Sequence, residues 1–344
     1  MPRSNLKNGV RAATGPARAR RTYRHLLRDE TGVGGVLVLL VLGIGIVRPD
    51  FLVPANLLTT VHNSVYIGLM ACGTVFALAM REVDLSVGGM YALGAVVGAL
   101  LIVHGWNTWL AALAVLLLSA LLGAANALIT TYARLPSFIV TLATAMLFRG
   151  VALALANGKQ IGGLPQGDAY FTLAGGTIGG ADAGVWVLLI AVVVLTVMFT
   201  RTRFGARVRA IGSNPDAAAF SGLPVTRTRI AALALSGLMA GVAGALALAF
   251  FAAGDPTIGV GYELNAIAAA IIGGTPLAGG RGSVPGAVIG SLLLSVVAAA
   301  LVFFQIPINW TTFATGGVIL FAVVLDSLLR RVRDRRAAHI SGGA

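Results

Sequence analysis

The chain has 344 residues and almost no cysteine, with Cys72 as its only one. A single cysteine cannot form a disulfide within the chain, and it excludes a cysteine-based metal site. Cys72 lies inside an apolar segment, where a small, inert buried side chain is the ordinary interpretation.

Charged residues are scarce as well. They make up 11% of the chain, whereas a soluble domain carries about 25%. Hydrophobic residues make up 57%, and the mean hydropathy is +0.90. A chain with so few charges cannot cover a water-facing surface, so its surface must face lipid. The apolar segments, about 15 to 25 residues long, have the length of spanning helices. We therefore predict an all-α polytopic membrane protein.

The signatures of common catalytic sites are also missing. The phosphate-binding pattern G-x-x-x-x-G-K-[ST] does not occur, because the Gly158-Lys159 pair is followed by Gln160. No H-E-x-x-H, C-x-x-C or nucleophile-elbow pattern is present. We therefore expect a conduit rather than an enzyme, with no metal and no cofactor held by this chain. The histidines are scattered and are interpreted as incidental: His25, His62, His104 and His339.

The basic residues that are present lie in clusters beside apolar segments. Of 25 Lys and Arg residues, eight lie in residues 1–30, six in 201–229 and five in 330–336. Clusters of this kind set membrane orientation and contact anionic lipid. This distribution argues against nucleic acid as a partner, although the net charge is +13.

Ten apolar segments are predicted to span the membrane. Residues 1–30 are expected to be a disordered basic cytoplasmic tail, 31–329 the transmembrane domain, and 330–344 a second basic cytoplasmic tail. The first span resembles a signal peptide, but the spans that follow favour an uncleaved helix. The weakest span is 262–274, because it is short. The spans are about 34–47, 65–80, 88–104, 107–131, 137–156, 182–200, 229–252, 262–274, 283–304 and 310–327.

The charges predict one topology for these spans. With both termini in the cytoplasm, cytoplasmic segments hold 22 basic residues and outer segments hold two, Arg48 and Lys159. This is a strong positive-inside bias. The four tryptophans fall near the predicted outer ends, as in an interfacial aromatic belt. The basic segment 201–229 is then cytoplasmic.

Glycines spaced four residues apart predict faces where helices pack closely. The alternative interpretation is that this spacing arises by chance, because the chain is rich in glycine. The sets are Gly94 and Gly98, Gly237 and Gly241, and Gly282, Gly286 and Gly290.

A charged interruption separates two apolar segments at residues 81–88. One charge at the bilayer centre costs roughly 2.5–3.5 kcal/mol on insertion scales. Glu82 and Asp84 therefore belong in a turn, a cavity or an ion pair. One interpretation is a short cytoplasmic turn in which Asp84 or Ser86 caps the next helix. The other is a broken helix that lines a pathway.

A second interruption covers residues 259–283, where Glu263 and Asn265 precede a glycine-rich stretch that includes Gly273 and Gly274. This glycine density cannot maintain a regular helix. The segment is either a cytoplasmic turn or a re-entrant segment beside a pore. Arg149 is the other costly charge, and a pairing with Glu263 is one way to satisfy it.

Four motifs in order then resemble a known family. They are VDLSVG (83–88), LPSFIVTLAT (135–144), TRFGARVRAIGSNPDAAAFSG (202–222) and YELNAIAAAIIGGTPLAGGRGS (262–283). Together they resemble the ribose/xylose/arabinose-type permease subunits of bacterial ABC importers, from about residue 50 to Asp326. The resemblance implies a type II importer permease in the bacterial inner membrane. Its implied partners are a second permease chain, an ABC ATPase that binds ATP and Mg²⁺, and an extracytoplasmic sugar-binding protein.

The resemblance also implies a coupling element inside 201–229. Asp216-Ala217-Ala218 followed by Gly222 looks like the E-A-A-x-x-x-G element of importer permeases, with Asp in place of Glu. Asn214 could cap this short helix and Pro215 suits its first turn. Arg81 departs from the pattern, which more often has a small or polar residue there. The implied coupling residues are Gly205, Arg207, Gly212, Asn214, Asp216, Ala217, Ala218 and Gly222; the pathway or gate candidates are Glu82, Asp84, Ser86, Thr141, Arg149, Glu263, Asn265, Gly273 and Gly274.

Two other classes of protein compete with an importer permease. An ion- or proton-coupled secondary transporter needs intramembrane acidic residues, for which only Glu82, Asp84 and Glu263 are candidates. A membrane enzyme has no supporting motif. Within the importer class, the substrate is expected to be a pentose, a hexose or a related polyol.

Overall fold

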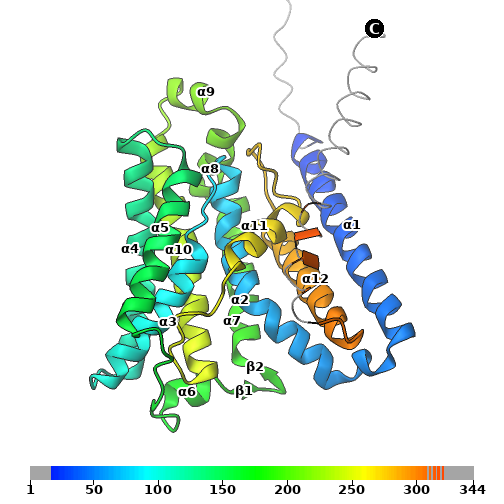
Figure 1. Cartoon of the computed structure of the whole chain (residues 1–344). Helices are drawn as coiled ribbons and strands as arrows, with labels where there is room; N and C mark the ends of the chain where they lie inside the picture. The colour runs from blue at the N-terminus through cyan, green and yellow to red at the C-terminus, as the bar shows by residue number, and fades with distance from the viewer. Residues whose placement is uncertain (1–16, 308–309, 311–312, 315, 318–319, 321–344) are drawn as a thin grey trace, which may run out of the picture.

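The protein is a bundle of helices, described by a computed structural model over residues 17–307, 310, 313–314, 316–317 and 320 (Figure 1). The predicted span 310–327 and the tail 330–344 lie largely or wholly outside these residues. In chain order the elements are α1 (Ala17–Val47), the 3-10 helix η1 (Pro49–Leu52), α2 (Pro54–Ala79), α3 (Val87–Val103), α4 (Thr108–Tyr132), α5 (Ser137–Leu155), α6 (Ala169–Ala174), β1 (Thr177–Ile178), β2 (Ala181–Asp182), α7 (Ala183–Arg201), α8 (Arg203–Ser213), α9 (Pro215–Phe220), α10 (Val225–Phe251), α11 (Tyr262–Ile272) and α12 (Val284–Phe303).

Six of the described helices are long and apolar enough to cross a membrane: α2, α4, α5, α7, α10 and α12. Three apolar stretches are shorter, namely Gly32–Val47 of α1, α3 and α11. The mostly helical fold agrees with the prediction, and most predicted spans begin and end within a few residues of these helices. The second span was predicted to begin at residue 65, whereas α2 begins at Pro54. Proline suits the first turn of a helix.

Helix α2 forms the centre of the bundle. In its most apolar window 89% of the residues are buried, against 22% for α5 and 28% for α7. The helices α10, α12, α11 and α7 pack around it. Side chains of α4, α5 and α7 remain exposed and apolar along one face, as expected for helices that contact lipid. Movement of α2 therefore affects every neighbouring helix.

Two local features lie beyond the predicted pattern. Helix α1 begins at Ala17, within the segment predicted as a disordered tail, and no glycine or proline interrupts residues 17–31. The strands β1 and β2 form a small antiparallel ribbon that an all-α prediction misses. Its two-residue turn is Gly179-Gly180, and both residues have positive φ, which glycine adopts without steric cost.

The spaced glycines do mark close helix contacts. A Cβ atom added to Gly237 of α10 would lie 2.2 Å from the Ser119 carbonyl oxygen of α4. One on Gly290 of α12 would lie 2.2 Å from the Ala269 carbonyl oxygen of α11. These backbones approach so closely that only glycine fits, so the predicted packing faces are confirmed.

We predict that Gly237→Val destabilises the protein in detergent by about 2 kcal/mol, because overpacking a tight contact costs about 1–3 kcal/mol. Gly150→Val is the matched control, since nothing lies within 4 Å of a Cβ at that position in α5. Thermal unfolding of both purified variants tests this. Equal stability of the two variants would contradict the close-contact argument.

Candidate functional site

The charged interruption after α2 is a break between two helices, and it is buried within the bundle. Glu82 is 8% exposed, and Asp84 and Ser86 are fully buried. Ser86 occupies the N-cap position of α3, but its own side chain makes no cap hydrogen bond. The capping role predicted for Ser86 is therefore not seen, and a pathway lined by this break stays a prediction.

Hydroxyl groups from the first two turns of α5 hold the backbone of this break. The Ser137 Oγ accepts a hydrogen bond of 3.0 Å from the Val83 N–H. The Thr141 Oγ1 accepts one of 3.1 Å from the Leu85 N–H and lies 3.0 Å from the Val83 carbonyl oxygen. These side chains replace the helical bonds that the extended residues have lost. Thr141, a predicted pathway residue, therefore contacts the break.

Asp84 lies at the centre of a buried polar cluster. Its Oδ1 accepts bonds from the Ser86 N–H at 3.0 Å and the Ser86 Oγ at 2.5 Å. The Asn126 Nδ2 of α4 donates to the Ser86 Oγ at 2.8 Å. Asp84 and Ser86 therefore link the break to α4.

Glu82 forms an ion pair with Arg229, which lies near the start of α10. Its Oε1 lies 2.6 Å from the Nε of Arg229, and the Arg229 Nη1 donates to the Thr131 Oγ1 of α4 at 3.1 Å. Arg229 belongs to the segment predicted as the coupling loop. The pair joins that segment directly to the break, a contact between residues 147 positions apart.

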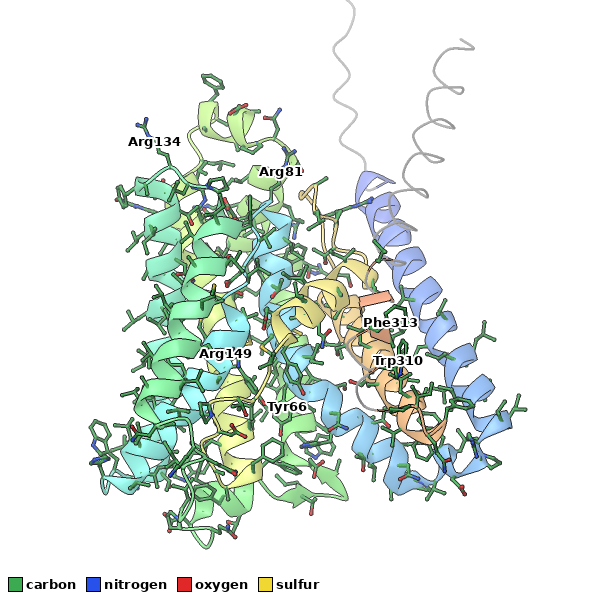
Figure 2. All side chains as sticks on the ribbon, in the orientation of Figure 1. Tyr66, Arg81, Arg134, Arg149, Trp310 and Phe313 are labelled. Carbon is green, nitrogen blue, oxygen red and sulfur yellow. The ribbon has the colours of Figure 1, made fainter. Side chains whose placement is uncertain are left out.

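Arg149 lies about two thirds of the way along α5, well away from Arg81 and Arg134 at one end of the bundle (Figure 2). Its guanidinium donates to the carbonyl oxygens of Ile258 at 3.1 Å, Gly259 at 3.2 Å and Gly88 at 3.3 Å. Backbone carbonyls of two segments thus satisfy this charge.

The proposed pairing of Arg149 with Glu263 is not formed. No ion pair within 4.0 Å joins them, although the Glu263 carboxylate also packs against Gly88. The Glu263 Oε2 is buried and makes no hydrogen bond with the described residues. Asn265 lies half-buried nearby in the first turn of α11. Arg149 and Glu263 therefore both lie beside the start of α3.

The glycine-rich interruption follows α11, whose 11 residues extend about 16 Å, roughly half the hydrocarbon core of a bilayer. Gly273 packs directly against the backbone of Gly286 in α12, where a Cβ would lie 2.1 Å from a carbonyl carbon. Gly274 has a φ of +97°. Thr275 is fully buried and accepts a bond of 3.2 Å from the Ser283 N–H. The segment therefore enters the bundle at Gly273 and Thr275, while Leu277, Ala278 and Arg281 between them and α12 are exposed.

The predicted coupling segment contains two helices, α8 and α9. The Asn214 Oδ1 accepts a bond of 3.0 Å from the Ala217 N–H, and Pro215 is in the first turn of α9, so both expectations are confirmed. Asp216 and Ala217 are exposed, whereas Ala218 is buried.

Glycines fix the two ends of α8. A Cβ on Gly205 would lie 2.1 Å from the Phe199 carbonyl oxygen of α7, and one on Gly212 would lie 1.7 Å from the Ala79 carbonyl oxygen of α2. Arg207 between them is exposed. Gly222, after α9, has a φ of +76° and open space around it.

Sequence reasoning missed three side chains in these regions. Phe220 at the end of α9 is 93% exposed. The His62 Nδ1 of α2 lies 2.8 Å from the Asp182 Oδ2 at the start of α7, so His62 is not incidental to the structure. Arg81 binds the end of α8. Of the three, only Arg81 could have been noticed in the sequence, because the family that the chain resembles more often has a small or polar residue at that position.

The sequence matches the family described as "Branched-chain amino acid transport system / permease component" over residues 56–323. The chain belongs to this family. As a permease component, it is the membrane part of a transport system and not an enzyme.

The chain is also similar to individual permease proteins that are named for the sugar they transport. The chain is 33% identical to the L-arabinose ABC transporter permease protein AraH of Azospirillum brasilense, over 96% of each chain. It is 37% identical to the ribose import permease protein RbsC of Bacillus subtilis, over 84% of this chain and 90% of the relative. It is 33% identical to the xylose transport system permease protein XylH of Escherichia coli, over 82% and 87%.

The Glu82–Arg229 ion pair provides a test of the break. Glu82→Ala should cost about 2 kcal/mol of stability, because it leaves a half-buried guanidinium without its carboxylate. A double-mutant cycle with Arg229→Ala, measured by unfolding in detergent, should give a coupling energy of about 1–2 kcal/mol. Glu82→Gln, which keeps an acceptor, should cost less. Additive effects of the two alanine changes would contradict the pairing.

Proposed function

We propose that this chain is the permease subunit of an ATP-driven importer for a monosaccharide, a pentose, a hexose or a related polyol. The observation that carries this proposal is the similarity, over more than four fifths of the chain, to relatives named for arabinose, ribose and xylose transport. Two of the three acidic candidates for ion coupling give a secondary transporter little support. Glu82 is neutralised by Arg229, and Asp84 is enclosed among hydroxyl and amide groups.

We propose that the end of the bundle carrying α8 and α9 faces the cytoplasm, together with both chain termini. Arg81 and Arg134 lie at this end, and α1 begins there (Figures 1 and 2). The helix α6 and the ribbon β1–β2 lie at the opposite end (Figure 1). The positive-inside bias supports this orientation. Ten spans remain our proposal for the whole chain.

Helices α8 and α9 form the proposed docking surface for an ABC ATPase, which would bind ATP and Mg²⁺ itself. Asp216, Ala217 and Phe220 are exposed there, and an exposed aromatic side chain is a typical anchor at protein interfaces. Gly205, Gly212 and Asn214 shape the two helices, while Ala218 packs α9 onto its neighbours. Exposed Arg207 and the turn at Gly222 complete the proposed coupling set.

The pathway candidates divide into two groups. Arg149 and Glu263 lie beside the start of α3, and Asn265 is in the same turn of α11 as Glu263. The buried Glu263 carboxylate oxygen and the Arg149 guanidinium have no charged partners among the described residues. We propose that these residues line the sugar pathway. The others position backbone at the two interruptions: Glu82, Asp84, Ser86 and Thr141 at the first, and Gly273 and Gly274 at the second.

The proposed assembly has three further partners: a second permease chain, an extracytoplasmic sugar-binding protein and membrane lipid. The chain would alternate between outward and inward openings as the ATPase closes and opens. Sugar specificity would then lie largely in the binding protein.

Uptake of labelled L-arabinose, D-ribose and D-xylose by the source strain tests the function. Deletion of the gene for this chain should lower uptake of at least one of these sugars or of a related polyol more than tenfold, and the intact chain should restore it. Arsenate, which lowers ATP while the proton gradient is kept, should abolish this uptake. Uptake that persists in arsenate would favour a secondary transporter.

We predict that Phe220→Ala reduces co-purification of the ATPase at least tenfold, because hot-spot aromatics contribute about 2 kcal/mol or more. Leu173→Ala is the control, since Leu173 is 54% exposed on α6 at the other end of the bundle. Membrane insertion of both variants should be unchanged. Normal ATPase binding by the Phe220 variant would contradict the assigned surface.

A further inference from the structure

Arg81 adopts a backbone conformation that arginine does not favour. The end of α2 is a Schellman motif, in which the Glu82 N–H donates to the Ala77 carbonyl oxygen at 3.0 Å and the Arg81 N–H donates to that of Leu78 at 2.9 Å. Arg81 holds the left-handed position of this motif with a φ of +66°. Glycine is the usual residue there, because a Cβ atom strains this conformation. Such a conformation persists where the surrounding structure holds it in place.

The Arg81 side chain binds the joint between α8 and α9. Its Nε donates to the Gly212 carbonyl oxygen at 2.6 Å, and its Nη2 donates to the Ser213 carbonyl oxygen at 2.8 Å. These oxygens belong to the last turn of α8, which has no helical donors for them. A guanidinium at this end also complements the helix dipole. The α9 helix, with its exposed Asp216 and Phe220, begins only two residues after Ser213.

A third segment completes this contact. The Gly280 N–H donates to the Ala79 carbonyl oxygen, the last of α2, at 2.8 Å. A Cβ on Gly279 would lie 2.6 Å from the Arg81 Cγ and 3.0 Å from the Gly212 carbonyl oxygen. The Arg81 stem, although Arg81 is exposed, thus lies against both α8 and the glycine-rich turn that leads into α12. The end of α2 cannot shift without moving these segments.

Arg134 shows what the same residue does without such a task. It follows α4 at the same end of the bundle and also has a positive φ, of +55° (Figure 2). Its side chain is exposed and makes no hydrogen bond or ion pair with the part of the chain that the structure describes. Positive-inside charge accounts for Arg134. It does not account for two directed hydrogen bonds from Arg81 to one helix end.

We propose that Arg81 is the positioning residue that transmits movement of the α8–α9 joint to α2, the central helix of the bundle. This rests on the proposed function, in which an ATPase moves α9. The bidentate guanidinium fixes the joint to the end of α2, and Glu82, the next residue, fixes that same end to α10 through Arg229. Displacement of α9 therefore reaches α2 and α10 together. Without the guanidinium, α9 can move while α2 stays in place.

Arg81→Gly separates this role from folding, because glycine relieves the backbone strain and removes only the side chain. Arg134→Gly makes the same exchange at a matched helix end. Each permease variant is purified with the ATPase, reconstituted in liposomes with the binding protein, and supplied with the sugar that the wild-type complex imports. We expect Arg81→Gly to keep ATPase co-purification and ATP hydrolysis within twofold of wild type, and to lower sugar imported per ATP at least tenfold. Arg134→Gly should change neither quantity.

Two further measurements exclude a purely structural role. The melting temperature of Arg81→Gly should equal or exceed that of wild type, and Arg81→Lys, which keeps the charge but not the planar fork, should import sugar at an intermediate yield. A wild-type yield in Arg81→Gly, a lowered melting temperature, or loss of ATPase binding would each overturn the transmitting role. Failure of the wild-type complex to bind the ATPase or import any sugar would instead refute the proposed function.

Discussion

An unpaired polar group costs more in the interior of this bundle than at its ends, and both helix interruptions are built around that cost. Residues 82–86 have left the helical hydrogen-bond pattern, and hydroxyls of Ser137 and Thr141 take over the backbone groups. Backbone carbonyls of two segments surround the Arg149 guanidinium. Each irregular segment is therefore held by groups from another helix. An interruption held in this way cannot move alone, so small displacements become concerted ones.

The same constraint explains why contacts converge on the end of α2. Its last carbonyl oxygen, at Ala79, is bound by Gly280, and the following residues, Arg81 and Glu82, bind α8 and α10. Close approach is possible because Gly212 has no side chain, and any Cβ there would overlap the Ala79 carbonyl. The result is a rigid junction at one end of a deeply buried helix. The helices α4, α5 and α7 expose apolar side chains that can contact lipid.

Hydrophobic length and charge predicted most of the helices, because those properties act locally along the chain. Asn214 and Pro215 predicted the start of α9 for the same reason. The start of α2 at Pro54 was missed because polar residues such as Asn56, His62 and Asn63 obscure its first turns. The pairs His62–Asp182 and Glu82–Arg229 join residues more than a hundred positions apart. The hydrophobic periodicity of a sequence does not reveal such contacts. The Arg149–Glu263 pairing considered from the sequence was chosen by charge alone.

Arg81 shows that counting basic residues predicts membrane orientation but not the contacts of an individual arginine. Counted among basic residues, it supports one membrane orientation, and so does Arg134 with equal weight. Their backbones are also alike, since both follow a helix with a positive φ. Only the partners differ, because two carbonyl oxygens of α8 accept bonds from Arg81, while Arg134 has no such acceptors among the described residues. An arginine that sets membrane orientation needs only to lie on the cytoplasmic side of the membrane. An arginine that joins two helices needs a side chain held in one fixed geometry. The Gly212 and Ser213 carbonyl oxygens supply that geometry, because they fix the Arg81 guanidinium at the end of α8.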